Sequence, residues 1–380
     1  MPNVFIPRER RRGETRVAAT PETVKKMVKS GLEVTLERGA GELAFFRDAD
    51  YEAAGARLED DPARGWSAAD IVLKVTAPEP AEAAGLRSGA LLVGLLAPHR
   101  ELDLVRLLAE RGATALAMEL IPRITRAQTM DALSSQANIG GYKAVLLAAL
   151  HLPKYVPLLM TAAGTIKPAR MVIMGAGVAG LQAIATARRL GAIVEVSDVR
   201  PAVKEQVQSL GARFIELPLA ESGEGQGGYA REMGEDFLRR QREIIQQHLS
   251  QADAVITTAL VPGRPAPKLV TAGMVDAMRP GAVIVDLAVE QGGNCELSQA
   301  DQQVVHGGVV ILGPSNLPAT MPHDASALYA RNVNALLQLL WKDGQLAVDP
   351  ADEVIAGSLL THEGRVTHGP TAERLGAPAS

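Results

Sequence analysis

The chain has 380 residues, of which 47% are hydrophobic and 22% are charged, and its formal net charge is −4. This length is sufficient for two ordinary hydrophobic cores, and the composition excludes a chain that is disordered over most of its length. The small acidic excess gives no electrostatic reason to expect a nucleic acid as partner.

The first residues are basic but carry no export signal. The arginines at positions 8, 10, 11 and 12 are interrupted by Glu9 and followed by Glu14, and we interpret them as a solvated flank. No apolar signal segment follows them, and the one cysteine, Cys295, excludes an intrachain disulfide. No uncharged apolar stretch approaches about 18 residues. We therefore expect a cytoplasmic chain that does not itself span a membrane but can dock on a protein that does.

Strand-like and helix-like segments alternate through the first third of the chain. A short strand, Val4 to Ile6, precedes a helix that Thr20-Pro21-Glu22 opens and Gly31 ends. An amphipathic helix is expected from Glu101 to Arg111. The alternation predicts a doubly wound α/β unit, and no glycine fingerprint follows its strands. Its further strands are expected at Glu33 to Glu37, Ile71 to Val75, Ala90 to Leu96 and Thr114 to Met118.

Pro122 ends this alternation. A polar loop, Arg123 to Gln128, leads into a long helix that we expect from about Thr129 through Leu150, crossing between domains. Asp131 and Ser134 follow Gln128 at three-residue intervals, so the three side chains would share one face of the helix start. That face is a candidate site if it looks into a cleft.

Helix capping explains the same residues equally well. Thr125 and Gln128 fit the S/T-x-x-Q capping box, and Asp131 can stabilise the N-terminal dipole. Arg123 is then a solvated loop charge. The residue pattern alone leaves the site and the cap as open alternatives.

The stretch from Arg170 to Arg200 has the pattern of a strand, a glycine turn, a helix and a second strand that ends in an acid. Gly175, Gly177 and Gly180 have the G-x-G-x-x-G spacing. The first glycine permits a tight turn, the second lets the backbone approach a pyrophosphate, and the third lets the helix pack closely on the strand. The helix is expected from about Val178 to Leu190, with its N–H groups facing the anion.

Asp198 indicates the cofactor class. A carboxylate at the end of the second strand accepts hydrogen bonds from the ribose hydroxyls of NAD and repels the 2′-phosphate of NADP, by roughly two decades of affinity. We therefore predict NAD(H) as the cofactor, with Arg200, two residues further on, able to soften the discrimination.

The remaining elements complete a second sheet and return the chain to the first domain. A helix at Ala325 to Trp341 is long enough for the return. We therefore predict an α/β fold of two doubly wound, Rossmann-like parallel-sheet domains joined by long helices. Residues 1–128 with 327–380 would form the first domain and residues 129–326 the NAD(H)-binding domain. The other expected helices are Ala202 to Leu210 and Asp236 to Leu249, and the strands Ile193 to Val196, Arg213 to Ile215, Ala254 to Thr258, Ala282 to Leu287 and Val309 to Leu312.

Two loops of the second domain are candidates for ligand contacts. The stretch from Glu221 to Gly234 contains five glycines and Tyr229, which is consistent with a tolerated surface insertion or with a lid over bound nucleotide. The stretch from Asp286 to Cys295 leaves a strand end at the edge where ligands bind in such sheets.

Lone polar residues of the first domain are weaker candidates. Arg16, Lys74 and His99 lie at strand ends or in loops, where such residues are more often structural or exposed than functional. No metal-ligand spacing and no nucleophile motif is present.

Several motifs together resemble the NAD(H)-binding component, domain I, of the proton-translocating nicotinamide nucleotide transhydrogenases, in the form of a separate alpha-1 type subunit. The resemblance covers nearly the whole chain, and alanine dehydrogenase is the related family. The motifs are RVAATPETV, the turn Gly39 to Gly41, PRITRAQTMDALSSQANIGGYKAV, GAGVAGLQAIATARRLGA, GGYAREMGEDF, TTALVPGRPAP, VDLAVEQGGNCE and PHDASALYARN.

The resemblance implies two groups of site residues. Arg123, Gln128 and Asp131 would form the loop beside the nicotinamide and carry the catalytic role. The implied cofactor-binding residues are Ser134, Gly175, Gly177, Val178, Gly180, Asp198, Val199, Tyr229, Ala259 and Leu260, and no metal is implied.

The departures from alanine dehydrogenase favour the transhydrogenases. Arg16 and Lys74 match the substrate-binding pair of alanine dehydrogenase, but its acid-base histidine aligns with Leu95 and its aspartate with Glu290, and His99 is not an equivalent position. Amino-acid oxidation requires a group that moves a proton, whereas hydride transfer between two nicotinamides requires only positioning.

The function implied is therefore hydride transfer between NADH and NADP⁺ bound on a partner component, coupled to proton movement through a membrane-spanning component. We expect a homodimer, docked on the inner face of the cell membrane. A soluble NAD-dependent amino-acid dehydrogenase is the second interpretation, and a non-enzymatic NAD-sensing module is the third.

Overall fold

The computed structural model describes residues 1–217, 235–260, 264–342 and 344–376, with the side chains of 235–238 excepted. It divides into two compact units: unit 1 is Met1–Gln136 with Pro318–Ser380, and unit 2 is Ala137–Leu317. The first domain is thus formed by two separate stretches of chain. The sequence predicted limits between two domains at residues 128/129 and 326/327. Those limits concern domains that fold independently, and they stay a prediction.

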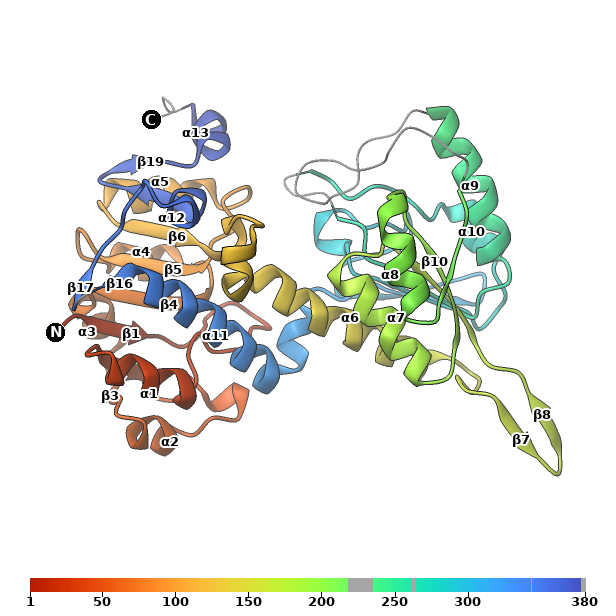
Figure 1. Cartoon of the computed structure of the whole chain (residues 1–380), viewed down its shortest axis with the longest axis horizontal. Helices are drawn as coiled ribbons and strands as arrows, with labels where there is room; N and C mark the ends of the chain where they lie inside the picture. Colours follow the sequence, from red (N-terminus) through yellow and green to blue (C-terminus); the bar gives the residue numbers. More distant parts are fainter. Residues whose placement is uncertain (218–234, 261–263, 343, 377–380) are drawn as a thin grey trace. The chain divides into compact units, whose positions relative to one another are not determined.

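Unit 1 is built on one mixed sheet with the strand order β19-β18-β6-β5-β4-β1-β2-β3. In Figure 1 the labelled strands of this sheet follow one another in that order, β19, β6, β5, β4, β1 and β3. Strands β1 to β6 are parallel to one another, and β18 and β19 are antiparallel additions at one edge. The strands are β1 (Asn3–Ile6), β2 (Glu33–Glu37), β3 (Arg57–Glu59), β4 (Ile71–Thr76), β5 (Leu91–Leu95), β6 (Thr114–Ala117), β18 (Leu359–His362) and β19 (Arg365–Val366), and a separate two-stranded ribbon joins β16 (Trp341–Lys342) to β17 (Gln345–Leu346).

Helices cover both faces of this sheet, because successive side chains of a strand point to opposite faces. In β4, Ile71 and Leu73 belong to one buried core and Val72 to the other. The helices are α1 (Pro21–Lys29), α2 (Asp48–Ala53), α3 (Pro62–Ala68), α4 (Pro80–Ala84), α5 (Leu102–Glu110), α11 (Pro322–Leu340), α12 (Glu353–Ser358) and α13 (Gly369–Leu375), with the 3₁₀ turns η1 (Glu42–Ala44), η2 (Met118–Leu120) and η3 (Thr125–Met130).

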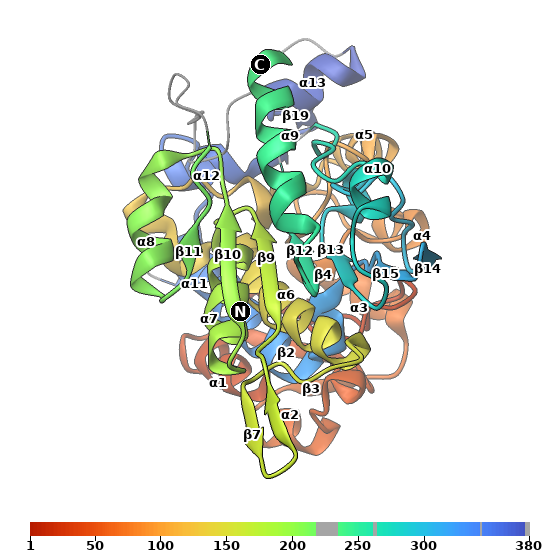
Figure 2. The ribbon, with the colours of Figure 1, turned by 90° about the vertical axis from the view of Figure 1, so that its right-hand side faces the viewer.

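Unit 2 contains a second sheet with the order β11-β10-β9-β12-β13-β15-β14, and Figure 2 shows these strands side by side in that order. All neighbours are parallel except β14, which pairs with β15 in the antiparallel sense. The strands are β9 (Arg170–Met174), β10 (Ile193–Ser197), β11 (Arg213–Phe214), β12 (Ala254–Thr257), β13 (Val283–Asp286), β14 (Gln303–His306) and β15 (Val309–Leu312), and β7 (Leu159–Thr161) and β8 (Gly164–Ile166) form a separate hairpin.

The helices of unit 2 also lie on both faces. One buried core contains residues of α6, α7 and α8, and the other contains residues of α9 and α10. These helices are α6 (Ala132–His151), which begins in unit 1, α7 (Val178–Arg189), α8 (Lys204–Ser209), α9 (Glu235–Leu249) and α10 (Ala272–Asp276), with the 3₁₀ turns η4 (Pro201–Val203) and η6 (Val289–Gln291). The 3₁₀ turn η7 (Leu317–Thr320) begins at the last residue of unit 2 and continues in unit 1.

Both parallel cores share one connectivity. When the six parallel strands of each unit are numbered in chain order, both read 3-2-1-4-5-6, the doubly wound order in which ligands bind where the strand order reverses. That point lies between β1 and β4 in unit 1 and between β9 and β12 in unit 2. The predicted fold class is confirmed, with antiparallel edge strands in addition.

One local prediction was wrong and another was only partly right. The long helix begins at Ala132, not Thr129, because residues 125–130 form the 3₁₀ turn η3. In the basic N-terminal run, Arg10 and Arg12 are exposed as predicted, but Arg10 pairs with Glu37 and Arg11 with Glu101.

Candidate nucleotide site and polar loop

The glycine turn after β9 has the geometry that close backbone packing requires. Gly175 has a φ of +103°, which a residue with a side chain adopts only under strain. A Cβ at Gly180 would lie 1.8 Å from the Gly175 carbonyl oxygen, whereas a Cβ at Gly177 would meet nothing within 4 Å. Because Gly180 has no side chain, α7 can pack directly on the turn. The space beside the Cα of Gly177 is open.

This open space lies at the start of α7, where an anion is stabilised. Val178 is the first helical residue, and Leu181 donates its N–H back to the Gly177 carbonyl at 2.8 Å. The N–H groups of a helix's first turn have no acceptor within the helix, and they carry the positive end of its dipole. The turn and the helix start therefore fit a pyrophosphate.

Asp198 holds the turn in place. One carboxylate oxygen accepts the N–H of Ala176 at 2.7 Å and the Arg200 guanidinium at 2.8 Å. The other accepts the N–H and the Nε of Arg200, at 2.8 and 2.9 Å. The buried carboxylate is thus ion-paired with Arg200, which reduces the repulsion that a free carboxylate would exert on a 2′-phosphate.

The end of β12 meets the glycine turn at the reversal of strand order. Thr258 donates its hydroxyl to the Gly175 carbonyl at 3.0 Å, and half-buried Ala259 and exposed Leu260 follow. Asn294 fixes this segment: its amide oxygen accepts the Ala259 N–H at 3.0 Å, and its amide nitrogen donates to the carbonyls of Ala259 and Pro267, both at 2.9 Å.

Asp286 organises the loop that carries Asn294. Its buried carboxylate accepts the hydroxyl of Thr257, the N–H groups of Ala288 and Cys295, and the hydroxyl of Ser298, at distances between 2.6 and 3.0 Å. Asp286, Asn294 and Thr258 thus shape the candidate site although none was predicted as a site residue. The loop from 286 to 295 had been predicted as a place for ligand contacts, but not these individual side chains. Their hydrogen bonds to backbone groups far away in the sequence leave no local sequence pattern.

The polar loop of unit 1 ends in a helix cap. Asp131 accepts the N–H of Ser134 at 2.8 Å and its hydroxyl at 2.6 Å, so Asp131 rather than Thr125 caps α6. The two residues therefore lie together, as predicted, but as cap and third residue of the helix, while Gln128 lies in η3.

Two contacts anchor this loop within unit 1. Arg126 donates to both oxygens of Asp352, at 2.8 and 3.1 Å, and these bonds lower the pKa of Asp352 to about 2. Asn332 of α11 donates to the Thr129 carbonyl at 2.8 Å. Arg123 and Gln128 have exposed side chains on this anchored loop.

Arg16 and Lys74, which are buried in unit 1, are each held by carboxylates. Arg16 donates to Glu14 at 2.6 and 2.7 Å and to the Gln136 side chain at 2.8 Å. Lys74 lies 3.4 Å from Glu9 and 3.3 Å from Glu82. Burial raises the pKa of Glu9, and the charge of Lys74 opposes that shift.

The remaining predicted residues are not gathered at one place. Val199 is half-buried after β10, His99 and Glu290 are exposed, and Leu95 ends β5. Tyr229 and the predicted lid, 221–234, lie outside the described residues. Within the described ranges, no group of three or more His, Cys, Asp or Glu residues is placed to hold a metal ion.

Comparisons with known proteins match nearly the whole chain. Two family models match, alanine dehydrogenase/PNT N-terminal domain over residues 5–140 and alanine dehydrogenase/PNT C-terminal domain over residues 144–369. A Rhodospirillum rubrum protein, named as the first portion of an NAD(P) transhydrogenase subunit alpha, is 48% identical over 374 residues, covering 96% of this chain and 97% of the relative.

Two further relatives show both branches of the likeness. An alanine dehydrogenase from Halomonas elongata is 33% identical, covering 98% of this chain and 96% of the relative. The crystal structure of a transhydrogenase from Sinorhizobium meliloti superposes with a TM-score of 0.88 at 46% identity, covering 96% of this chain and all of that one.

We predict that Asn294→Asp destabilises unit 2 by on the order of 3 kcal/mol, because a buried carboxylate would face two carbonyl oxygens and two amide donors would be lost. Glu290→Gln, an exposed change in the same loop, should stay within about 0.5 kcal/mol of the parent. The measurement is urea unfolding of each variant. Equal stability of Asn294→Asp and the parent would contradict the role of this amide.

Proposed function

The chain belongs to the alanine dehydrogenase/PNT family, and from that premise we propose that it is the NAD(H)-binding subunit of a proton-translocating transhydrogenase. It exchanges hydride between NADH and NADP⁺ held on a partner component, and a membrane-spanning component couples the exchange to proton movement. The relatives named NAD(P) transhydrogenase subunit alpha, at 46 to 48% identity, support this choice over the alanine dehydrogenase at 33%.

One observation carries the proposal: the described residues contain one dinucleotide cradle. Unit 2 has the turn at Gly175, the open helix start at Gly177 and the acid Asp198. Unit 1 has the same strand order, but Pro7, Arg8 and Glu9 follow its first strand in place of a glycine turn. A reaction between two nicotinamide nucleotides then requires the second nucleotide on another chain.

The alternative, an amino-acid dehydrogenase, needs a group that moves a proton at nitrogen or at water. The resemblance puts Leu95, at the end of β5, where alanine dehydrogenase has its histidine, and the exposed His99 follows Pro98 in the next loop. Bound NADH supplies the hydride, and the chain has only to hold and orient the ring, which is catalysis by positioning.

We propose that Arg123, Gln128 and Asp131 provide this positioning, with Ser134 beside them. The support is that the first two are exposed on a loop that the Arg126–Asp352 pair and Asn332 anchor, so ordering them costs little further entropy. The adenosine half of the nucleotide is assigned to Gly177, Val178, Asp198 and Val199, with Tyr229, Ala259 and Leu260 as further contacts.

For the loop we predict that Gln128→Asn or Asp131→Asn slows hydride transfer to the NADP⁺ component by about tenfold or more, about 1.4 kcal/mol in the barrier. Asn remains a good N-cap, so Asp131→Asn should leave stability within about 0.5 kcal/mol and NADH affinity little changed. Thr125→Ala, at an exposed residue of η3 outside the proposed site, is the matched control and should leave the transfer rate unchanged. The measurement is a single-turnover stopped-flow rate beside a melting curve. Parent-like rates in both variants would contradict the positioning role and leave Asp131 only as a helix cap.

For cofactor choice we predict that NADH binds about tenfold or more tightly than NADPH. Asp198→Asn should lower the ratio of the NADPH to the NADH dissociation constant. Arg200→Gln should raise this ratio, because the Asp198 carboxylate would then lack its counter-ion. Equilibrium dissociation constants for both nucleotides test this. Equal constants for NADH and NADPH in the parent chain would overturn the assignment of Asp198.

We also propose that the chain is a homodimer that docks on its membrane partners from the cytoplasm. None of the helices described here is long and apolar enough to cross a bilayer. The hairpin β7–β8 presents apolar side chains to solvent, with Met160 73% and Ile166 41% exposed, and Leu158, just before β7, is 54% exposed. An exposed patch of this kind is typical of a protein interface.

For the dimer we predict that Met160→Asp weakens self-association by about tenfold or more, since a charge would be buried in an apolar contact. Leu43→Asp, at a 56% exposed apolar residue of η1 in unit 1, is the control and should leave the dimer intact. Sedimentation velocity over a dilution series measures both. A parent chain that is monomeric at micromolar concentration would refute the dimer.

A further inference from the structure

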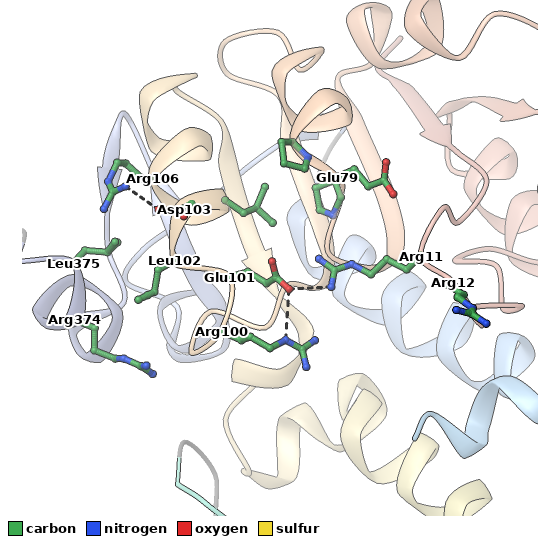
Figure 3. Close-up of a pocket in the computed structure, with 13 residues that line it drawn as sticks. Arg11, Arg12, Glu79, Arg100, Glu101, Leu102, Asp103, Arg106, Arg374 and Leu375 are labelled. Carbon is green, nitrogen blue, oxygen red and sulfur yellow. Dashed lines mark hydrogen bonds and ion pairs between the residues drawn. The ribbon is translucent and has the colours of Figure 1, made fainter. Parts of the chain in front are cut away.

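A second candidate site lies wholly in unit 1, apart from the nucleotide cradle of unit 2. It is a groove of about 890 Å³ between the N-terminal segment, the loop after β4, the start of α5 and helix α13 (Figure 3). A volume of this size is in the range of small-molecule sites, which is about 300 to 1,000 Å³. The prediction of a solvated basic flank gave this region no function.

The lining of this groove is basic in a chain that is acidic overall. Five arginines and three carboxylates line it, so its formal charge is +2 against −4 for the whole chain. Pro78, Pro80 and three leucines supply its apolar walls. The charged residues are Arg11, Arg12, Arg100, Arg106 and Arg374 with Glu79, Glu101 and Asp103.

Some of the charged side chains are held by ion pairs within the groove. Arg11 donates to Glu101 at 2.9 Å and to the Ala77 carbonyl at 3.0 Å, and Arg106 pairs with Asp103 at 2.9 Å. Figure 3 shows Glu101 between Arg11 and Arg100, whose Nε lies 3.5 Å from the carboxylate. Arg11 and Glu101 thus form a rigid centre of the lining.

The rest of the charge is available to a ligand. Arg12 and Arg374 are exposed, and the structure records no ion pair for either among the residues it describes. Arg374 of α13 and Arg100 of the loop before α5 both act on His99, whose pKa is lowered by partial burial and by these two charges. The lining thus takes arginines from three separate segments, and α5, which begins there, adds the positive end of its dipole.

We propose that this groove binds a small anion carrying two or more phosphate groups, of the size of a nucleoside polyphosphate. Arginine matches phosphate because its planar fork donates two parallel hydrogen bonds, and every cation in the lining is an arginine. A concave site with apolar walls suits a compact ligand better than an extended acidic segment of a protein. The inference does not depend on the proposed transhydrogenase function.

The test is isothermal titration with tripolyphosphate, carried out in the presence of saturating NADH so that the cradle of unit 2 does not contribute. The parent chain should bind at low salt, and Arg12→Ser with Arg374→Ser should weaken binding by about tenfold or more. Arg47→Ser removes an arginine that is 82% exposed in the same unit and should leave the dissociation constant within about twofold. Melting curves without ligand check that every variant folds.

Parallel arms identify the source of the phosphate groups. Nucleoside triphosphate that competes with tripolyphosphate indicates a free metabolite, whereas binding confined to vesicles containing phosphatidylinositol phosphates indicates a lipid headgroup. Both results support a phosphate site provided that the double variant weakens the binding by about tenfold or more. Absence of binding by the parent chain to tripolyphosphate, nucleoside triphosphate and the vesicles alike, or equal binding by parent and double variant, overturns the proposal.

Discussion

The nucleotide cradle depends on one constraint, the absence of a side chain at Gly180. A Cβ there would lie 1.8 Å from the carbonyl oxygen of Gly175, so α7 begins as close to the strand turn as the backbone permits. The same device recurs where α6 meets α7, since a Cβ at Gly141 would lie 2.0 Å from the Ala179 carbonyl oxygen. These two approaches place the first turn of α7 directly after β9, where its N–H groups are open to an anion.

The two sheets have the same strand order but carry different residues at the point where that order reverses. In unit 2, Gly175 and Thr258 line the point where the strand order reverses, and the space beside Gly177 is open. In unit 1, the corresponding point between β1 and β4 is filled by the chain's own charges, Glu9 and Lys74, and Tyr329 of α11 closes it by donating to the Lys74 carbonyl at 2.7 Å. Fold alone therefore does not specify a nucleotide site, and the residues at the strand ends decide it.

The sequence was most informative where a pattern is local. Met171 to Met174 and the spaced glycines specify a strand, a turn and a helix within a few residues, and these were predicted correctly. The start of α6 was misplaced because the pattern of residues 125–130 gives no sign of the 3₁₀ turn η3. The cap of α6, Asp131, is recognised only by its bonds to Ser134. The strand β18 was not predicted because it is short and pairs in the antiparallel sense with β6, which lies more than two hundred residues earlier in the chain. Asn294 escaped for a similar reason, since its partner Ala259 is 35 positions away.

The central claim is that hydride passes directly from NADH on this chain to NADP⁺ on a second component, with no proton-transfer group at the reacting carbons. It is tested most directly by mixing the chain with NADH dideuterated at C4 and an NADP⁺-loaded partner component, with pyruvate and ammonium present. The account predicts NADPH that carries one deuterium at C4, without exchange with solvent, and no labelled alanine. Deuterium found in alanine while NADPH stays unlabelled would contradict the account and identify the chain as an amino-acid dehydrogenase.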